Sequence, residues 1–374
     1  MNEKLQQALQ RASQLTRAGR LADATAAIQQ ALGRGARPPP ATPRPSDADI
    51  IDVEARVVGE RAPESERPAP PNEEAPGAAD DPSPGSFSTG RFRNQAGQRD
   101  YKLFRPHATP EDGRPPALVV MLHGCTQDPD DFAAGTRMNP LADTRGWWVL
   151  YPAQSARANG SGCWNWFKPA DQQRGGGEPE ILAGMTSDIV ARHGLDRSRV
   201  FVAGLSAGGA MAVTLAATHP ELVAAVGVHS GLPHGGAHDL MSALTAMRQG
   251  AAAHAPPHRV RTIVFHGDQD HTVHPCNGHA VARQARADPT PPGARDDGPT
   301  ETERARVPGG HAYTRTLHRD ADGRVDAEHW LIHGAGHAWS GGSPAGTYTD
   351  PRGPDASREM LRFFLAHRRD AGSN

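Results

Sequence analysis

A single serine stands between two glycines in the stretch VAGLSAGGAM, at position 206. Ser206 lies where an apolar run, 199–203, gives way to a small-residue segment typical of a helix. Gly204 and Gly208, two positions before and after it, allow the tight strand-to-helix turn that would expose a serine hydroxyl. The N-terminal amides of the following helix would point toward that hydroxyl. This motif is weak when it occurs alone, but in this setting it predicts a nucleophile.

A serine hydroxyl needs a base that takes its proton and an acid that orients the base. In a parallel sheet with such a turn, the acid and then the base follow the serine along the chain. The stretch VFHGDQDHTV offers Asp268 and Asp270, and the stretch WLIHGAGHAWSGG offers His333 and His337. Spacing leaves the choice of carboxylate open. His337 is the favoured base, since it lies in a glycine-flanked loop whereas His333 directly follows an apolar run.

Acyl transfer also needs two hydrogen-bond donors for the charge that develops on the carbonyl oxygen. We expect the amide of Ala207, at the start of the helix after the serine, to be one of them. The stretch VVMLHGCTQDPDDF supplies an early loop in which Gly124 permits a close backbone approach. The amide of Cys125 in this loop is the expected second donor, and His123 is interpreted as structural.

Apolar runs and helical patterns alternate around these residues, and Gly, Pro or His bounds each run. The runs lie at 117–122, 147–151, 199–203, 223–228 and 261–265. Helical patterns lie near 131–144, 178–193, 207–219, 238–249 and 354–368. Continuous apolar strands between helices are typical of a parallel sheet that is covered on both faces. The sequence therefore predicts an α/β fold with a mostly parallel, doubly wound sheet.

Two hairpins and one insertion complete the expected sheet region. The stretch 91–106 reads as two strands around an Ala-Gly turn. The stretch 313–332 reads as a second hairpin with Asp-Gly in its turn. Residues 285–308 are rich in Pro, Asp and Arg, which indicates a surface insertion.

The chain before the sheet has a different composition. Residues 1–32 carry two short amphipathic patterns around Gly19, which predict a helical hairpin. Residues 33–86 are rich in proline and predict a disordered linker. The hairpin is interpreted as a small docking element, with adhesion to an anionic or apolar surface as the alternative. The expected catalytic domain covers 87–368, and 369–374 is a tail.

Five stretches occur together in this order: LHGCTQDPDDFAAGTRMNPLADTRGWWVLYP, GCWNWF, VAGLSAGGAMAVTLAATHPELVAAVGVHSG, HGDQDHTVHPCNG and GHAWSGG. Together they resemble the polyhydroxybutyrate (PHB) depolymerase family of esterases, an α/β-hydrolase family related to feruloyl and acetylxylan esterases. The resemblance covers about 87–368 and implies an α/β-hydrolase fold. It assigns Ser206 as the nucleophile, Asp270 as the acid and His337 as the base, and it implies neither a metal nor an organic cofactor.

The aromatic stretch SGCWNWFKP has two readings. Trp164 and Trp166 either pack over the sheet or form an apolar wall for an acyl or polyester chain, with Asn165 as a polar contact. Trp339, two residues after the expected base, is a further candidate for the same wall.

Three cysteines are too few for a disulfide-built scaffold. The resemblance implies a bridge between Cys125 and Cys163, with Cys276 as a lone buried thiol. Such a bridge indicates oxidising surroundings, and the family resemblance allows an extracellular location. Residues 1–14 lack the apolar core of a secretory signal, which favours the cytoplasm. The compartment therefore stays open at this point.

Composition limits the function classes. The formal net charge is −2 and no dense Lys/Arg run occurs, which argues against nucleic-acid binding. No window approaches eighteen apolar residues, so no transmembrane segment is expected. The leading hypothesis is a serine esterase that hydrolyses short-chain hydroxyalkanoate esters or polyesters through an acyl-enzyme. The alternatives are a feruloyl or acetyl ester hydrolase on polysaccharide, and an inactive protein that binds polymer granules, with residues 1–32 as the contact to the granule surface.

Overall fold

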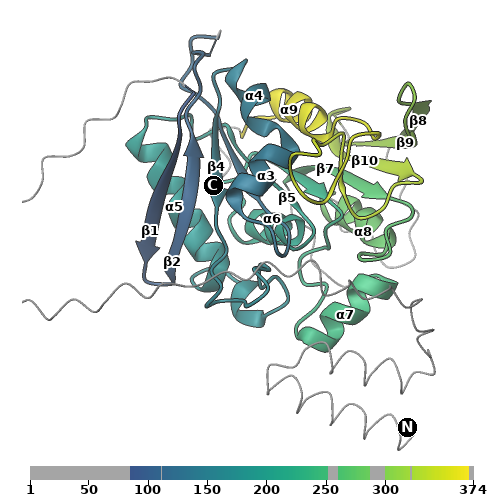
Figure 1. Cartoon of the computed structure of the whole chain (residues 1–374), viewed down its shortest axis with the longest axis horizontal. Coiled ribbons are helices and arrows are strands. Elements are labelled where there is room, and N and C mark those ends of the chain that lie inside the picture. Colours follow the sequence, from purple (N-terminus) through teal and green to yellow (C-terminus); the bar gives the residue numbers. More distant parts are fainter. Residues whose placement is uncertain (1–84, 111, 252–259, 287–299, 321, 370–374) are drawn as a thin grey trace, which may run out of the picture. The chain divides into compact units, whose positions relative to one another are not determined.

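A ten-stranded sheet runs through the part of the chain that the computed structural model describes, which is residues 85–110, 112–251, 260–286, 300–320 and 322–369 (Figure 1). Its central strands run parallel: β4 (Trp148–Pro152), β3 (Leu118–Leu122), β5 (Val200–Leu205), β6 (Ala225–His229), β7 (Arg261–Gly267) and β10 (Val325–His333). Antiparallel strands complete both edges: β2 (Gly97–Phe104) and β1 (Phe87–Asn94) beside β4, and β9 (Ala312–Arg319) and β8 (Thr300–Arg306) beside β10.

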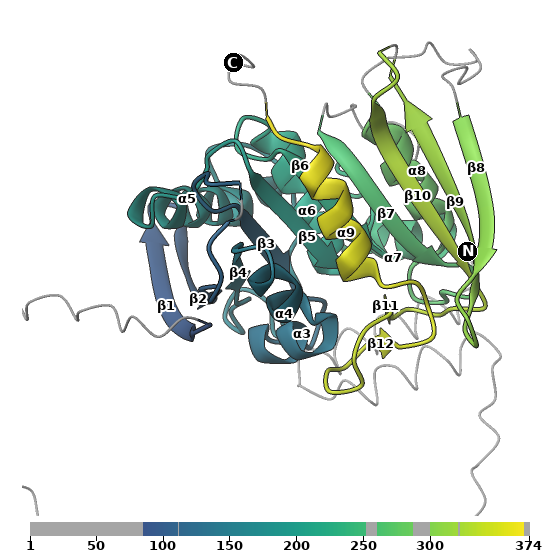
Figure 2. The same ribbon diagram turned by 90° about the horizontal axis from the view of Figure 1, so that it is seen from above.

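Helices cover both faces of this sheet (Figure 2). One face packs against α5 (Gly177–Arg192), α6 (Ala207–Thr218), α7 (Leu240–Gln249) and α8 (Cys276–Gln284). The other face packs against α3 (Pro129–Thr136), α4 (Met138–Asp143) and α9 (Ala356–Ala366). Strand β3 is apolar without a break because both of its faces are buried. Val120 packs in the core on the side of α5 to α8, and Val119 packs in the core on the side of α3, α4 and α9. A short turn of 3-10 helix (Pro169–Asp171) and a small pair, β11 (Trp339–Ser340) with β12 (Thr349–Asp350), lie outside the main sheet.

The order of the strands reverses between β3 and β5. From β5 the chain builds outward through β6, β7 and β10, and from β3 it builds the other way through β4. In a doubly wound sheet, sites form outside the carboxyl ends of the strands at such a reversal. The loop that contains Cys125 follows β3 there, and Ser206 follows β5. The fold is thus the expected α/β fold with a mostly parallel, doubly wound sheet, as in α/β-hydrolases.

Three local predictions differ from the structure. The helix expected over 131–144 is two helices, because Arg137 adopts a left-handed conformation with φ 53° and interrupts it. The expected insertion 285–308 contains a strand, β8. Its sequence TETERAR has Ala305 as its one apolar residue, because nearly all of the strand is exposed at the sheet edge. Helix α8 was not expected, since its short sequence CNGHAVARQ carries only a brief apolar pattern.

The described residues all lie in one compact unit, Ala78–Asn374. The predicted hairpin at 1–32 and almost all of the predicted linker at 33–86 lie outside the described residues, and they stay predictions. Among the described residues, no helix has both the length and the apolar character needed to cross a membrane.

Candidate active site

Ser206 occupies the sharp turn between β5 and α6. Its backbone has φ 57° and ψ −119°, in the positive-φ region that side-chain-bearing residues rarely adopt. The turn is held by the Ser206 N–H, which donates to the carbonyl of His229 at the end of β6, at 2.9 Å. A Cβ on Gly204 would lie 2.4 Å from the carbonyl carbon of Gly208. Glycine is therefore required beside the serine because the strand and the helix nearly touch.

Gly208 brings the same turn against the loop after β3. A Cβ at this position would lie 2.0 Å from the carbonyl oxygen of Leu122 and 2.5 Å from that of His123. The close approach places the start of α6 beside the loop that carries Cys125.

We expect Gly208→Ala to lower the free energy of unfolding by about 3 kcal/mol or more, because overpacking forces backbone to shift. Urea denaturation of the variant measures this loss. Gly160→Ala is the matched control, since a Cβ there would meet nothing within 4 Å. Equal stability of the two variants would contradict the close approach.

Asp270 and His337 meet across 67 residues of chain. The Nδ1 atom of His337 lies 2.8 Å from Oδ2 of Asp270. The other carboxylate oxygen, Oδ1, accepts the backbone amides of Thr272 at 2.9 Å and Val273 at 2.8 Å. Burial alone would raise the pKa of Asp270, but hydrogen bonds from His266 and His337 and the charge of His337 lower it below its ordinary value. The carboxylate is thus ionised, and its Oδ2 lies 2.8 Å from Nδ1 of His337 and 3.4 Å from Nε2 of His266.

A second Asp–His pair lies beside the first. His333 Nδ1 is 3.0 Å from Oδ2 of Asp268, and His333 Nε2 is 2.8 Å from the hydroxyl of Thr314. The side chains are 39% exposed for His333 and 30% for Asp268, against 13% for His337 and none for Asp270. Both ring nitrogens of His333 are therefore occupied. Of these two pairs, only that of Asp270 and His337 combines a buried carboxylate with an imidazole whose Nε2 makes no hydrogen bond in the described part of the chain.

The structure places Asp270 and His337 in hydrogen-bond contact, whereas Ser206 and His337 are not in such contact. In the described ranges, the Ser206 hydroxyl makes no hydrogen bond to the His337 ring. The two segments are instead joined through His229, whose carbonyl accepts the Ser206 amide and whose Nε2 accepts the amide of Ser340, three residues after the base, at 3.0 Å.

His229 is a buried residue to which the sequence assigned no role. Its Nδ1 lies 3.2 Å from the Ser230 hydroxyl, and its ring stacks on Phe265 and Trp339. Because Nε2 accepts a hydrogen bond from the Ser340 amide, the proton of the neutral ring must lie on Nδ1. Burial, followed by the nearby charges of His266 and His337, lowers the pKa of His229 to about 3.

This ring should make stability depend on pH. The unfolded chain takes up a proton at this residue below pH ~6.5, but the folded chain does so only near pH 3. Stability should therefore fall with decreasing pH between these values, by about 1.4 kcal/mol per pH unit from this ring. In urea denaturation at pH 6.5, 5.5 and 4.5, His229→Gln should show a slope smaller by about that amount.

His238→Gln is the matched control for this measurement, because His238 is exposed. Its slope should equal that of the unsubstituted chain. An unchanged slope in His229→Gln would mean that the buried ring carries a proton in the folded state.

The two expected donors come from the start of α6 and from the loop after β3. The amide of Ala207 begins α6, and the amide of Cys125 lies in the loop after β3. In the part of the chain that the structure describes, neither amide donates a hydrogen bond to another group. Next to Cys125, the Gly124 amide is bound by the side chain of Gln127 at 2.9 Å, which orders the loop. His123 is buried with both ring nitrogens engaged, by the Gly124 carbonyl and the Gln154 amide.

A disulfide joins Cys125 to Cys163, as the family resemblance implied. The amide of Thr126 also donates to the carbonyl of Ser161 at 2.9 Å. Both links tie the loop after β3 to the aromatic segment. The third cysteine, Cys276, is free and partly buried.

Replacing both bridged cysteines by alanine should lower the free energy of unfolding by about 4 kcal/mol, since the bridge closes a 38-residue separation. Chemical denaturation tests this, with Cys276→Ala as the control that should change stability much less. Counting thiols in the denatured, unreduced chain should find one, and finding three would rule out the bridge.

The predicted substrate-binding side chains are buried. Their residues are exposed by 0% for Trp164, 3% for Asn165, 6% for Trp166 and 1% for Trp339. Trp164 packs against the ring of His123, with 5.6 Å between the centroids. Trp339 packs edge-on against Phe132 and donates its indole N–H to Ser357 at 3.1 Å. These contacts show that Trp164 and Trp339 pack inside the protein. Contact of the four residues with substrate stays a prediction.

Glu178 binds the aromatic stretch SGCWNWFKP through Asn165. The sequence did not predict this role. Its buried carboxylate accepts hydrogen bonds from Arg99, Gln154 and Asn165. The backbone amide of Asn165 also donates to it, at 2.7 Å. In the sequence, an acidic residue in the first turn of an expected helix has an ordinary explanation in the helix dipole, so nothing marked it as a buried hub.

No group of three His, Cys, Asp or Glu side chains that could hold a metal ion occurs in the described part of the chain.

Comparison with known proteins finds a family match over part of the chain. Residues 100–284, which include Ser206 and Asp270, match the family model described as esterase PHB depolymerase. The match covers just under half of the chain. His337 lies beyond the matched segment.

Three curated proteins are similar to parts of the chain. Poly(3-hydroxyalkanoate) depolymerase C of Paucimonas lemoignei is 35% identical over 182 residues, which is 45% of this chain and 44% of that protein. Feruloyl esterase B of Neurospora crassa is 38% identical over 120 residues, 32% of this chain and 40% of that protein. Acetylxylan esterase A of Aspergillus awamori is 29% identical over 189 residues, 45% of this chain and 61% of that protein. The chain thus spans about half the length of these relatives.

A solved structure extends the likeness over more of the chain. The acetyl xylan esterase from Aspergillus awamori superposes with a TM-score of 0.57 and 21% identity, covering 75% of this chain and 99% of that one. At this identity the likeness concerns the fold, which the two chains share.

Proposed function

We propose that this chain is a serine esterase that hydrolyses carboxylic esters through an acyl-enzyme. The observation that carries the proposal is the buried Asp270–His337 pair, with its hydrogen bond of 2.8 Å, at the sheet edge where the strained turn holds Ser206. The match of residues 100–284 to an esterase family supports the same chemistry.

In the proposed reaction, the Ser206 hydroxyl attacks the ester carbonyl while Nε2 of His337 takes its proton. Asp270 holds the imidazole and stabilises its charged form. The amides of Ala207 and Cys125 donate to the oxygen of the tetrahedral intermediate. His337 then passes the proton to the departing alcohol, which leaves an acyl group on Ser206. A water molecule, deprotonated by the same imidazole, releases the acid and restores the serine.

Short-chain hydroxyalkanoate esters or polyesters are the proposed substrates, supported by the similarity to a protein named poly(3-hydroxyalkanoate) depolymerase C. Feruloyl or acetyl esters on polysaccharide are the second candidate, supported by the similarity to feruloyl esterase B and acetylxylan esterase A. Rates on hydroxybutyrate oligomers, methyl ferulate and acetylated xylan separate the two. Faster hydrolysis of ferulate or acetyl esters than of the oligomers would favour the second.

A fluorophosphonate probe tests the proposed nucleophile independently of the substrate. The unsubstituted chain should be labelled and Ser206→Ala should not. Labelling that survives in Ser206→Ala would place the nucleophile elsewhere. Absence of any labelling would favour an inactive, granule-binding protein.

Binding to polymer granules through residues 1–32 is a finer proposal, which rests on the amphipathic pattern of that segment. Hydrolysis of amorphous polyester granules by the full chain and by a chain that begins at Ser86 tests it. Equal rates would remove the adhesion role and leave the esterase proposal standing.

A further inference from the structure

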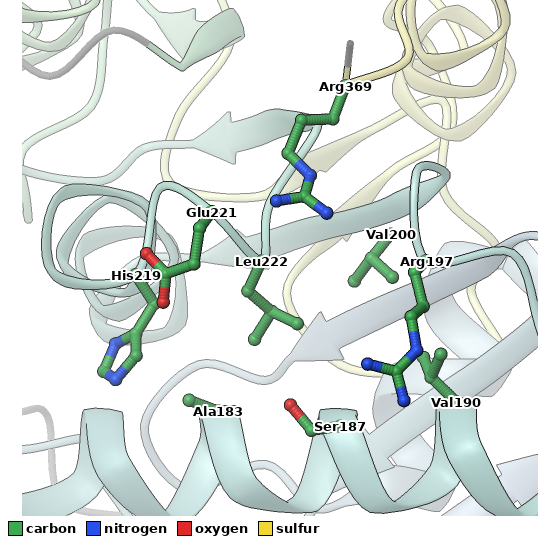
Figure 3. A pocket seen from close by; sticks show the side chains of 9 residues that line it. All are labelled: Ala183, Ser187, Val190, Arg197, Val200, His219, Glu221, Leu222 and Arg369. Carbon is green, nitrogen blue, oxygen red and sulfur yellow. The ribbon is translucent and has the colours of Figure 1, made fainter. Parts of the chain in front are cut away.

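A cavity of about 260 Å³ lies at the end of the sheet away from Ser206. Figure 3 shows the side chains that line it. Val200, the first residue of β5, lines it, whereas Ser206 follows the last residue of that strand. At about 3.3 Å per residue, the strand separates the two by roughly 20 Å. The cavity is therefore distinct from the candidate active site, although one strand joins them.

Two arginines enter the cavity from different sides. Figure 3 shows the guanidinium groups of Arg197, from the loop before β5, and Arg369, after α9, both directed toward the hollow. The Arg369 amide donates to the carbonyl of Ser198 at 2.9 Å, which fixes that part of the chain beside the loop. The Nε of Arg369 is buried and has no hydrogen-bond partner within the described ranges.

The other ionisable groups of the cavity have partners of their own. The carboxylate of Glu221 forms an ion pair with Arg174. The Nε2 atom of His219 lies 3.4 Å from Glu180, and burial lowers the pKa of this histidine. Neither Arg197 nor Arg369 forms an ion pair with another described residue. The lining therefore holds two arginine side chains without an ion-pair partner in the described ranges, and one carboxylate, Glu221, which Arg174 pairs.

The remaining wall is mostly aliphatic. It consists of Ala183, Val190, Val200 and Leu222. The hydroxyl of Ser187, on α5, also faces the hollow (Figure 3). A volume just under the range of drug-sized ligand sites suits a small molecule.

We propose that this cavity binds a short-chain aliphatic carboxylate. The two guanidinium groups bind the carboxylate, which matches their planar donor geometry, and the aliphatic wall accommodates the hydrocarbon chain. Ser187 is placed to hydrogen-bond a hydroxyl substituent. A hydroxy acid of this kind is the class of product that the proposed hydrolysis of a hydroxyalkanoate ester releases, and this last link alone rests on the proposed function.

Titration of the full chain with sodium 3-hydroxybutyrate, followed by ligand-observed NMR, tests the proposal. The chain carries Ser206→Ala, so binding is measured without turnover. Arg197→Gln and Arg369→Gln should each raise the dissociation constant at least tenfold. Arg304→Gln, an exposed arginine on the edge strand β8, is the matched control and should leave it unchanged. The exposed Arg197 can be replaced without loss of packing, so this variant decides the test if Arg369→Gln fails to fold.

Two comparison ligands define the chemistry. Uncharged 1,3-butanediol should bind at least tenfold more weakly, because it lacks the carboxylate. Inorganic phosphate should also bind more weakly, because it cannot use the aliphatic wall. Equal affinity of phosphate and 3-hydroxybutyrate, equal affinity of the arginine variants and the parent chain, or no binding at all would each overturn the proposal. Hydrolysis by the unsubstituted chain is scored separately, so failure here and failure of the esterase proposal are distinguishable.

Discussion

Replacement of Ser206 by alanine is expected to lower kcat for p-nitrophenyl butyrate by about 10⁴-fold or more. The proposed reaction passes through a covalent bond to the Ser206 oxygen, so no other side chain substitutes for it. The Cβ of the serine remains, and the turn is held by the backbone hydrogen bond to His229. The variant should therefore fold normally, which its denaturation curve checks.

His337→Ala should produce a loss of similar size, and the double variant should lose little more than either single variant. Residues that act as one unit lose their function together, so their effects do not add. His333→Ala is the matched control, because that imidazole has the same kind of carboxylate partner but its Nε2 is engaged by Thr314. A larger loss in His333→Ala than in His337→Ala would reverse the choice of base.

Asp270→Asn is the second change with a large expected effect, a fall in kcat of about 10⁴-fold. The amides of Thr272 and Val273 both donate to Oδ1, so in asparagine the oxygen must stay on that side. The new NH₂ group would then face Nδ1 of His337 and drive the ring proton to Nε2. With Nε2 protonated, the imidazole cannot take the proton of Ser206.

Asp268→Asn provides the control for this prediction. Its carboxylate has a matching arrangement, since Oδ1 accepts the amide of Gly334 at 2.8 Å and Oδ2 contacts His333. We expect a change in kcat of less than tenfold, measured on the same ester. Similar losses in both variants would mean that the charge of this loop matters and that the tautomer of His337 does not.

The sequence by itself located the turn that carries Ser206, because that signal is local. The apolar run, the two glycines and the small-residue helix are adjacent in the chain, and the structure shows why both glycines are required: the strand, the turn and the loop after β3 approach too closely for a side chain. The parallel sheet was also readable, since strands buried on both faces are continuously apolar. The edge strand β8 was missed because exposure on both faces removes that signal.

Only the tertiary structure decided how the later loops pair. Residue spacing left Asp268 and Asp270 equally available, and the resemblance to esterases was needed to choose between them. In the fold each carboxylate meets its own histidine, and burial together with the occupied nitrogens of His333 distinguishes the two pairs. The roles of two buried side chains, the carboxylate of Glu178 and the ring of His229, could not be predicted from the sequence either. Their contacts join residues far apart in the chain, and the chain neighbours of a residue do not encode which distant atoms the packing of the sheet and its helices will bring beside it.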